Sequence, residues 1–173
     1  NTIKITMGAN NTQIASGATL SVSAAALTNT SAAMTFIGTE SETDGFLSIT
    51  GGAGADVITG GGAADTINVG TGDSVSAGSG NDTIAFTGTL AAATAVGGAG
   101  DDTITSAGAV TSAANLDGGD GNDTITITGA VTAATVVGGA GNDTLNLNGA
   151  TNTVGSITTV ETIGGGSGVD TLT

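Results

Sequence analysis

Residues 118–127 read Gly118-Gly119-Asp120-Gly121-Asn122-Asp123-Thr124-Ile125-Thr126-Ile127, a glycine-rich turn followed by a short alternating segment. The turn fits the pattern Gly-Gly-x-Gly-x-Asp, and an apolar residue, Ile125, follows two positions after its final aspartate. Polar and apolar residues then alternate with a period of two, as they do in a β-strand that buries one face. This stretch therefore predicts a turn that leads directly into a strand.

Four further copies of the turn occur along the chain. They are Gly51-Gly52-Ala53-Gly54-Ala55-Asp56, Gly97-Gly98-Ala99-Gly100-Asp101-Asp102, Gly138-Gly139-Ala140-Gly141-Asn142-Asp143 and Gly165-Gly166-Ser167-Gly168-Val169-Asp170. Degenerate or shortened turns end at Asp65, Asp73 and Asp82. Aspartate favours turns in general, but that preference does not explain an apolar residue at a fixed distance after it. We therefore interpret the turns as repeats of one structural unit, whose glycines permit backbone conformations with positive φ.

The spacing of the final aspartates changes along the chain. Steps of 8 or 9 residues between Asp56 and Asp82 give way to steps of 20 or 21 residues between Asp82 and Asp143. In the second part, alanine-rich segments that are too short and too rich in β-branched residues for helices stand where an aspartate turn is missing. We expect return strands in 90–96, 110–116 and 131–137. This alternation of strand and turn is typical of a right-handed parallel β-roll or β-helix, an all-β solenoid.

Residues 1–50 show the repeat only weakly. Segments 2–7 and 19–22 alternate as strands do, and 38–44 resembles a degraded turn that contains Glu40 and Glu42. We therefore predict two parts: divergent N-terminal coils or a cap in residues 1–50, and the solenoid in residues 51–173. Such a cap would cover strand edges that stacked coils otherwise leave unpaired.

The composition excludes several classes of function. Fifteen acidic residues face a single lysine, Lys4, for a net charge of -14, so we expect no nucleic acid or anionic lipid as a partner. The chain has no cysteine and no histidine, which excludes disulfides, thiolate or imidazole metal sites, and Ser-His or Cys-His nucleophile pairs. No apolar run approaches the roughly 20 residues that span a bilayer. We expect neither an enzyme nor a membrane-inserted protein.

Acidic side chains stacked on neighbouring coils need a counter-charge. Coils about 4.8 Å apart would bring two carboxylates close enough to repel by about 3.5 kcal/mol at an effective dielectric constant of 20. Carboxylates combined with backbone carbonyls form an all-oxygen ligand set, which suits Ca²⁺, whereas zinc and iron favour nitrogen or sulfur. We expect several calcium ions along one column of aspartates from Asp65 to Asp170, with Asp56 and Asp73 on the opposite edge.

The nonapeptide Gly-Gly-x-Gly-x-Asp-x-(apolar)-x resembles the RTX (repeats-in-toxin) family of calcium-binding β-rolls, also called hemolysin-type calcium-binding repeats. The resemblance covers residues 51–173, and five copies at regular spacing make it specific. It implies that the final aspartates bind calcium together with backbone carbonyls. The predicted ligands are Asp56, Asp65, Asp73, Asp82, Asp102, Asp123, Asp143 and Asp170. The other acids, which are Glu40, Glu42, Asp101, Asp117, Asp120 and Glu161, are interpreted as solvated surface charges.

The resemblance also implies a cellular role. RTX proteins are typically exported from Gram-negative bacteria by type I secretion, and this composition is most similar to the surface-layer (S-layer) branch. We therefore predict an extracellular, calcium-stabilised structural module of a bacterial cell-surface protein that self-assembles into a surface layer or filament. Two alternatives remain open: a stalk or secretion module of an RTX adhesin, toxin or exported hydrolase, and ice or glycan binding by a threonine-rich face. Cell-surface polysaccharide is a further candidate partner.

Overall fold

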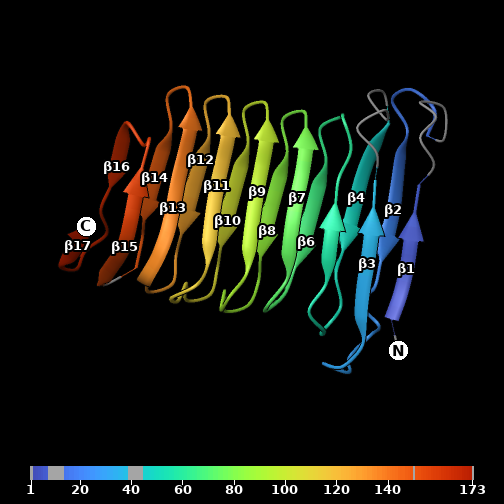
Figure 1. The fold of residues 1–173 in the computed structure, drawn as a ribbon, viewed down its shortest axis with the longest axis horizontal. Coiled ribbons are helices and arrows are strands. Elements are labelled where there is room, and N and C mark those ends of the chain that lie inside the picture. The colour runs from blue at the N-terminus through green and yellow to red at the C-terminus, as the bar shows by residue number, and fades with distance from the viewer. Residues whose placement is uncertain (1, 8–13, 39–44, 150, 173) are drawn as a thin grey trace.

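A computed structural model of the chain is a flattened solenoid built from two stacked β-sheets (Figure 1). The structure describes residues 2–7, 14–38, 45–149 and 151–172. The degraded turn expected around Glu40 and Glu42 lies outside the described residues.

Successive strands alternate between the two sheets, and every pairing is parallel. The nine-stranded sheet, called the front sheet after its place in Figure 1, contains β1 (Thr2–Thr6), β3 (Ala33–Ile37), β5 (Val57–Thr59), β7 (Ser74–Ser79), β9 (Thr94–Ala99), β11 (Asn115–Asp120), β13 (Thr132–Ala140), β15 (Asn152–Thr158) and β17 (Asp170–Leu172). The eight-stranded back sheet contains β2 (Thr19–Ser23), β4 (Phe46–Thr50), β6 (Thr66–Val69), β8 (Thr83–Phe86), β10 (Thr103–Ser106), β12 (Thr124–Ile127), β14 (Thr144–Leu147) and β16 (Thr162–Gly164). Each coil therefore consists of one front strand and one back strand.

The path of the chain defines two edges. In Figure 1 the front strands run upward and the back strands downward while the chain advances from right to left, which makes the coil right-handed. The chain passes from front to back at the upper edge and from back to front at the lower edge. This architecture confirms the predicted all-β parallel solenoid.

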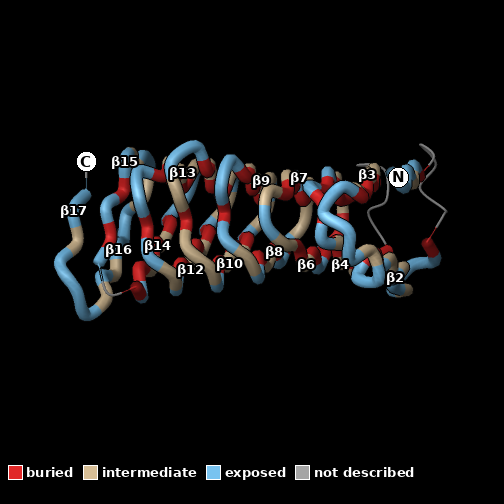
Figure 2. Tube along the Cα trace, turned by 90° about the horizontal axis from the view of Figure 1, so that it is seen from below, coloured by how far each residue is buried: buried red, intermediate tan, exposed pale blue. Residues whose placement is uncertain are grey.

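Buried residues recur along both sheets (Figure 2), and the core between the sheets consists mainly of aliphatic side chains. One column of the back sheet places residues of the same type above one another and fully buries them: Ile49, Ile67, Ile84, Ile104, Ile125 and Leu145. The predicted strands at 124–127 and 144–147 are β12 and β14, with isoleucine or leucine inward as expected. The period-two pattern is sufficient here because each strand buries one face only.

The predicted return strands occur, but each begins later than the sequence suggested. Leu90, Val110 and Val131 lie in the lower-edge turns, are buried, and pair with one another through isolated β-bridges. A residue in the left-handed region redirects the chain at the start of each strand. Ala92 and Ala113, with φ of 56° and 78°, precede β9 and β11, and Ala133, with φ of 55°, is the second residue of β13. Left-handed backbone costs alanine about 1–2 kcal/mol, so the buried aliphatic residues must hold these turns in place.

The N-terminal part continues the same two sheets. The segments expected as strands at 2–7 and 19–22 are β1 and β2, which pair with β3 and β4. The back sheet continues across residue 50, since β4 pairs with β6. The predicted division into two parts at this residue stays a prediction. Among the described residues, no helix is long and apolar enough to cross a membrane.

Candidate metal sites along the upper edge

Five aspartates stand above one another at the upper edge, each immediately before a strand of the back sheet. Their side chains are at most 2% exposed, although a carboxylate is rarely buried without a partner. The column consists of Asp65, Asp82, Asp102, Asp123 and Asp143. The repeated turn therefore brings together acids that lie 17 to 21 residues apart in sequence.

One oxygen of each carboxylate links its coil to the preceding one. Oδ1 of Asp123 accepts the backbone N–H of Asp102 at 2.8 Å, and Oδ1 of Asp143 accepts that of Asp123 at 2.8 Å. Asp82 and Asp102 accept the N–H groups of Asp65 and Asp82 in the same way. Hydrogen bonds to an ionised acceptor are stronger than neutral ones, so this chain of bonds fixes the distance between coils.

The second oxygen is different. Oδ2 of Asp102, Asp123 and Asp143 is buried and has no hydrogen-bond partner. Leaving a buried polar atom unsatisfied costs about 1–3 kcal/mol, and more for a charged one. Three such oxygens in one column are therefore a specific sign that another group belongs beside them.

A backbone carbonyl converges on each of these oxygens. A Cβ atom added to Gly97 would collide with both Oδ2 of Asp102 and the carbonyl oxygen of Gly118, so these two oxygens face the same small space. The same holds at Gly118 for Asp123 and the carbonyl of Gly138. The first glycine of the turn is thus required because it leaves room between coils.

The second and third glycines are required for backbone conformation. They adopt positive φ between 111° and 140°, as the tight turn predicts: Gly98, Gly100, Gly119, Gly121, Gly139 and Gly141. The glycines of the copies at 51–56 and 165–170 do not adopt it. Those two copies lie at the lower edge, so one sequence motif forms two kinds of turn.

The arrangement fits calcium. The described residues contain no group of three or more acidic side chains that could hold a metal by themselves. The upper edge instead offers carboxylate oxygens from successive coils and carbonyls between them, a flexible oxygen-only set of the kind that calcium accepts. A shared divalent ion would satisfy Oδ2 of Asp102 and of Asp123 and cancel the repulsion between neighbouring carboxylates.

Asp56 and Asp73 occupy the lower edge, as predicted, but all their carboxylate oxygens have partners. Oδ1 of Asp73 accepts the N–H of Asp56 at 2.7 Å, and its Oδ2 accepts that of Gly70 at 2.6 Å. Asp56 accepts the N–H groups of Met34 and Gly52 at 2.6 Å each. Their role as calcium ligands stays a prediction.

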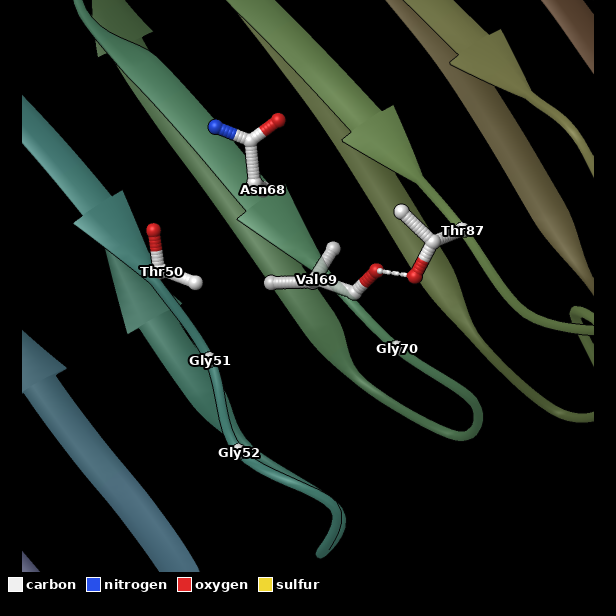
Figure 3. Close-up of a pocket in the computed structure, with 7 residues that line it drawn as sticks. All are labelled: Thr50, Gly51, Gly52, Asn68, Val69, Gly70 and Thr87. Atoms are coloured by element: carbon white, nitrogen blue, oxygen red, sulfur yellow. Dashed lines mark hydrogen bonds between the residues drawn. The ribbon is translucent and has the colours of Figure 1, made fainter. Parts of the chain in front are cut away.

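A hollow of about 110 Å³ lies beside these lower-edge turns (Figure 3). It forms where glycines provide no side chain, and Thr87 closes one side by donating to the carbonyl of Val69 at 3.2 Å. Its lining consists of Thr50, Gly51, Gly52, Asn68, Val69, Gly70 and Thr87. No carboxylate lines it, so the hollow does not extend the metal sites.

In the three coils after that of Asp73, the lower edge has no aspartate. The next three coils place a buried alanine in register with Asp73: Ala93, Ala114 and Ala134. Together with Leu90, Val110 and Val131 they make this edge apolar. In these coils one edge is therefore held by charge and the other by hydrophobic packing.

The prediction that Asp170 ends the upper column is wrong. Asp170 opens β17 of the front sheet and pairs with Asn152, which places it at the lower edge. Its Oδ1 accepts Nδ2 of Asn152 at 2.8 Å. The step of 27 residues from Asp143 is one coil of 18 residues plus half a coil of 9, and counting aspartates alone could not show this. A calcium role for Asp170 stays a prediction.

Two further features were not recognised from the sequence. Glu161, interpreted as a surface charge, takes the next position of the upper column, because its Oε2 accepts the N–H of Asp143 at 2.7 Å. Outside the column, Asp101 Oδ1 accepts the backbone N–H of Asn122, and Asn122 Oδ1 accepts that of Asn142, which forms a second ladder between coils. The 18-residue step from Asp143 is the only sequence signal for Glu161.

Burial makes the ionised form of several of these aspartates unfavourable when no cation is bound. Burial, with the nearby charges of Asp123 and Asp101, raises the pKa of Asp102 to about 7, although a hydrogen bond from the Asp82 backbone opposes the shift. Burial is also the main cause that raises the pKa of Asp123 and of Asp73. Without a cation, the fold therefore favours the protonated forms of Asp102 and Asp123.

Calcium-depleted protein should lose stability as pH rises. The carboxyl group of Asp102 has a pKa near 3.8 when unfolded and about 7 when folded, so the folded chain binds more protons between these values. The cost is absent below about pH 4 and complete above about pH 7. Circular dichroism of protein depleted on a chelating resin should therefore show more β-sheet signal at pH 5 than at pH 8. A larger signal at pH 8 would contradict the pKa shift.

Replacing Gly118 by alanine should weaken calcium binding, because the new methyl group would occupy the space between Asp123 Oδ2 and the carbonyl of Gly138. We expect a rise of about 10- to 100-fold in the calcium concentration needed for folding, as for other groups that position metal ligands. Gly70→Ala is the matched control, since its nearest neighbours would lie at 3.4 and 3.7 Å. Calcium titrations followed by circular dichroism measure both. Equal effects of the two substitutions would show that the space beside Gly118 is not a metal site.

Comparison with known families agrees with this geometry. The family model of the RTX calcium-binding nonapeptide repeat matches residues 48–75, 70–85, 87–108, 115–126 and 129–154. No curated protein and no solved structure matches the chain. The matched segments cover more than half of the sequence and contain all five aspartates of the upper column. Glu161 lies outside them. The chain therefore belongs to the RTX calcium-binding nonapeptide repeat family.

Proposed function

We propose that the chain is a calcium-stabilised structural module of a secreted bacterial cell-surface protein. The observation that carries this proposal is the pair of buried Oδ2 atoms of Asp102 and Asp123, which have no hydrogen-bond partner and face backbone carbonyls of the next coil. Calcium bound there would join neighbouring coils. The ion then acts as part of the fold.

The expected gain in stability is large enough to decide folding. If free calcium is about ten times the dissociation constant of a site, each site adds about 1.4 kcal/mol. The two intervals after Asp102 and Asp123, where an unpartnered Oδ2 faces a backbone carbonyl, would together add about 3 kcal/mol. The total stability of a domain is only about 5–15 kcal/mol. Calcium concentration would therefore control whether the module is folded.

The chemistry of the site supports a structural role over a catalytic one. The carboxylates of the upper column are buried beneath the backbone and bonded to amides of the preceding coil. The hollow in Figure 3 contains threonine, asparagine and glycine but no acid or base. We propose no reaction for this chain.

We propose an extracellular location because folding would depend on the calcium concentration. Carboxylate–carbonyl sites of extracellular modules bind calcium weakly, with dissociation constants of about 10⁻⁴–10⁻³ M, and such sites fill only where calcium is abundant. Folding would then follow export. The family match supports this reading, since it concerns calcium-binding repeats.

The outer face of the back sheet supports assembly with other copies. Six threonines align along it with one residue per coil: Thr66, Thr83, Thr103, Thr124, Thr144 and Thr162. The neighbouring outward row also lacks charge: Thr50, Asn68, Ala85, Thr105, Thr126 and Asn146. In a chain with a net charge of -14, an uncharged face is where copies repel least. We propose that this face contributes to a surface layer or filament.

Removal of calcium should unfold the module. We expect the β-sheet circular dichroism signal to disappear in chelator at pH 7.5 and to return with millimolar calcium. Asp123→Asn should raise the calcium midpoint, because it removes a charge that faces the Gly138 carbonyl. Asp120→Asn, an exposed neighbour with the same change in charge, should have a much smaller effect. A signal that persists in chelator would overturn the proposal.

Assembly should depend on the back-sheet face. Sedimentation velocity in millimolar calcium should show large species for the parent chain and a shift to monomer for Thr124→Glu, which places a charge in the middle of the threonine row. Ser76→Glu adds the same charge to the exposed face of the front sheet and is the control. A parent chain that stays monomeric at high concentration would rule out intrinsic assembly.

A further inference from the structure

We propose that the upper column contains one more calcium site, formed between the turn of Asp143 and the turn of Glu161. This inference rests on the proposed function, in which the column binds calcium. Neither the repeat pattern nor the family match marks this site, because no Gly-Gly-x-Gly-x-Asp turn precedes Glu161 and the match ends at residue 154.

Glu161 makes the contact that identifies members of the column. Its Oε2 accepts the backbone N–H of Asp143 at 2.7 Å, as Oδ1 of Asp143 accepts that of Asp123 at 2.8 Å. The strand that follows, β16, pairs in register with β14, with Thr162 opposite Thr144. Glu161 therefore stands directly in line with Asp143.

The same pair of oxygens also meets in this interval. Oδ2 of Asp143 is buried, lacks a hydrogen-bond partner and faces the position of a Cβ on Gly138. The backbone carbonyl of Thr159 faces that position too, where the two preceding intervals place the carbonyls of Gly118 and Gly138. Three successive intervals thus share one arrangement, although the last has a threonine and a glutamate in place of the motif residues.

Three local changes allow a shorter turn to reach the same position. Glu161 follows Thr159 by two positions, whereas Asp143 follows Gly138 by five. Thr159 adopts the left-handed region with φ of 51°, and its hydroxyl accepts the N–H of Gly139 at 2.8 Å, which ties the turn to the preceding coil. The extra methylene of glutamate supplies the remaining reach.

A role for Glu161 as a backbone cap alone leaves Asp143 unexplained. A cap satisfies the N–H of Asp143, but Oδ2 of Asp143 stays buried without a partner. No basic side chain can provide one, because Lys4 is the single basic residue of the chain and lies in β1, at the opposite end of the front sheet. A bound cation satisfies Oδ2 of Asp143, the Thr159 carbonyl and the charge of Glu161 together.

Counting bound calcium tests the proposal. Glu161→Gln keeps the length and a carbonyl that can accept the Asp143 N–H, but it removes the charge. By equilibrium dialysis with radioactive calcium, we expect this variant to bind one ion fewer per chain than the parent. Asp120→Asn removes the same charge from an exposed position of the same edge and should bind as many ions as the parent.

A second measurement needs no variant. Terbium replaces calcium at oxygen sites and scatters X-rays anomalously, so a crystal of the parent chain grown with terbium should show an anomalous peak between Asp143 and Glu161. The inference is overturned if a folded Glu161→Gln variant binds as many ions as the parent. It is also overturned if this peak is absent while the other intervals are filled. Either result leaves the proposed function intact. A parent chain that binds no calcium overturns both.

Discussion

The structure depends on one repeated interaction, the hydrogen bond from the amide of an upper-edge aspartate to the carboxylate of the next. Asp102 donates to Asp123, and Asp123 donates to Asp143. Each bond uses one carboxylate oxygen to hold two coils in register and leaves the other oxygen facing the next glycine turn. On the proposed function, the same side chain therefore both positions the coils and binds the metal.

The turns at the two edges of the solenoid are stabilised by different interactions. The upper edge keeps its carboxylates and, on the proposed function, its calcium throughout the long coils. The lower edge replaces the carboxylate of Asp73 with Ala93 and its successors and inserts Leu90, Val110 and Val131 into the core. An apolar edge needs no ion but forces Ala92 and its equivalents into the left-handed region. The coil grows from 17 residues to 20 or 21 because this turn needs more chain.

Much of the fold could be predicted because the repeat is local. The period-two alternation in 124–127 identifies a strand without reference to any other coil, and the turn motif specifies where each strand begins. The left-handed glycines, such as Gly119 and Gly121, followed from the tightness of the turn. Gly118 is different: it is required by the carbonyl of Gly138 in the next coil, a contact between residues 20 positions apart that no local pattern contains.

The sequence by itself determined the strands, the turns, the excess of carboxylates over cations and hence the need for a hard metal ion. Only the tertiary structure decided which acids share an edge. Asp170 has the full motif yet lies at the lower edge with Asn152, whereas Glu161 has no motif yet bonds to Asp143. The reason is physical: a half-coil of nine residues moves a side chain to the opposite edge, so membership of the column depends on accumulated coil length and not on the local turn.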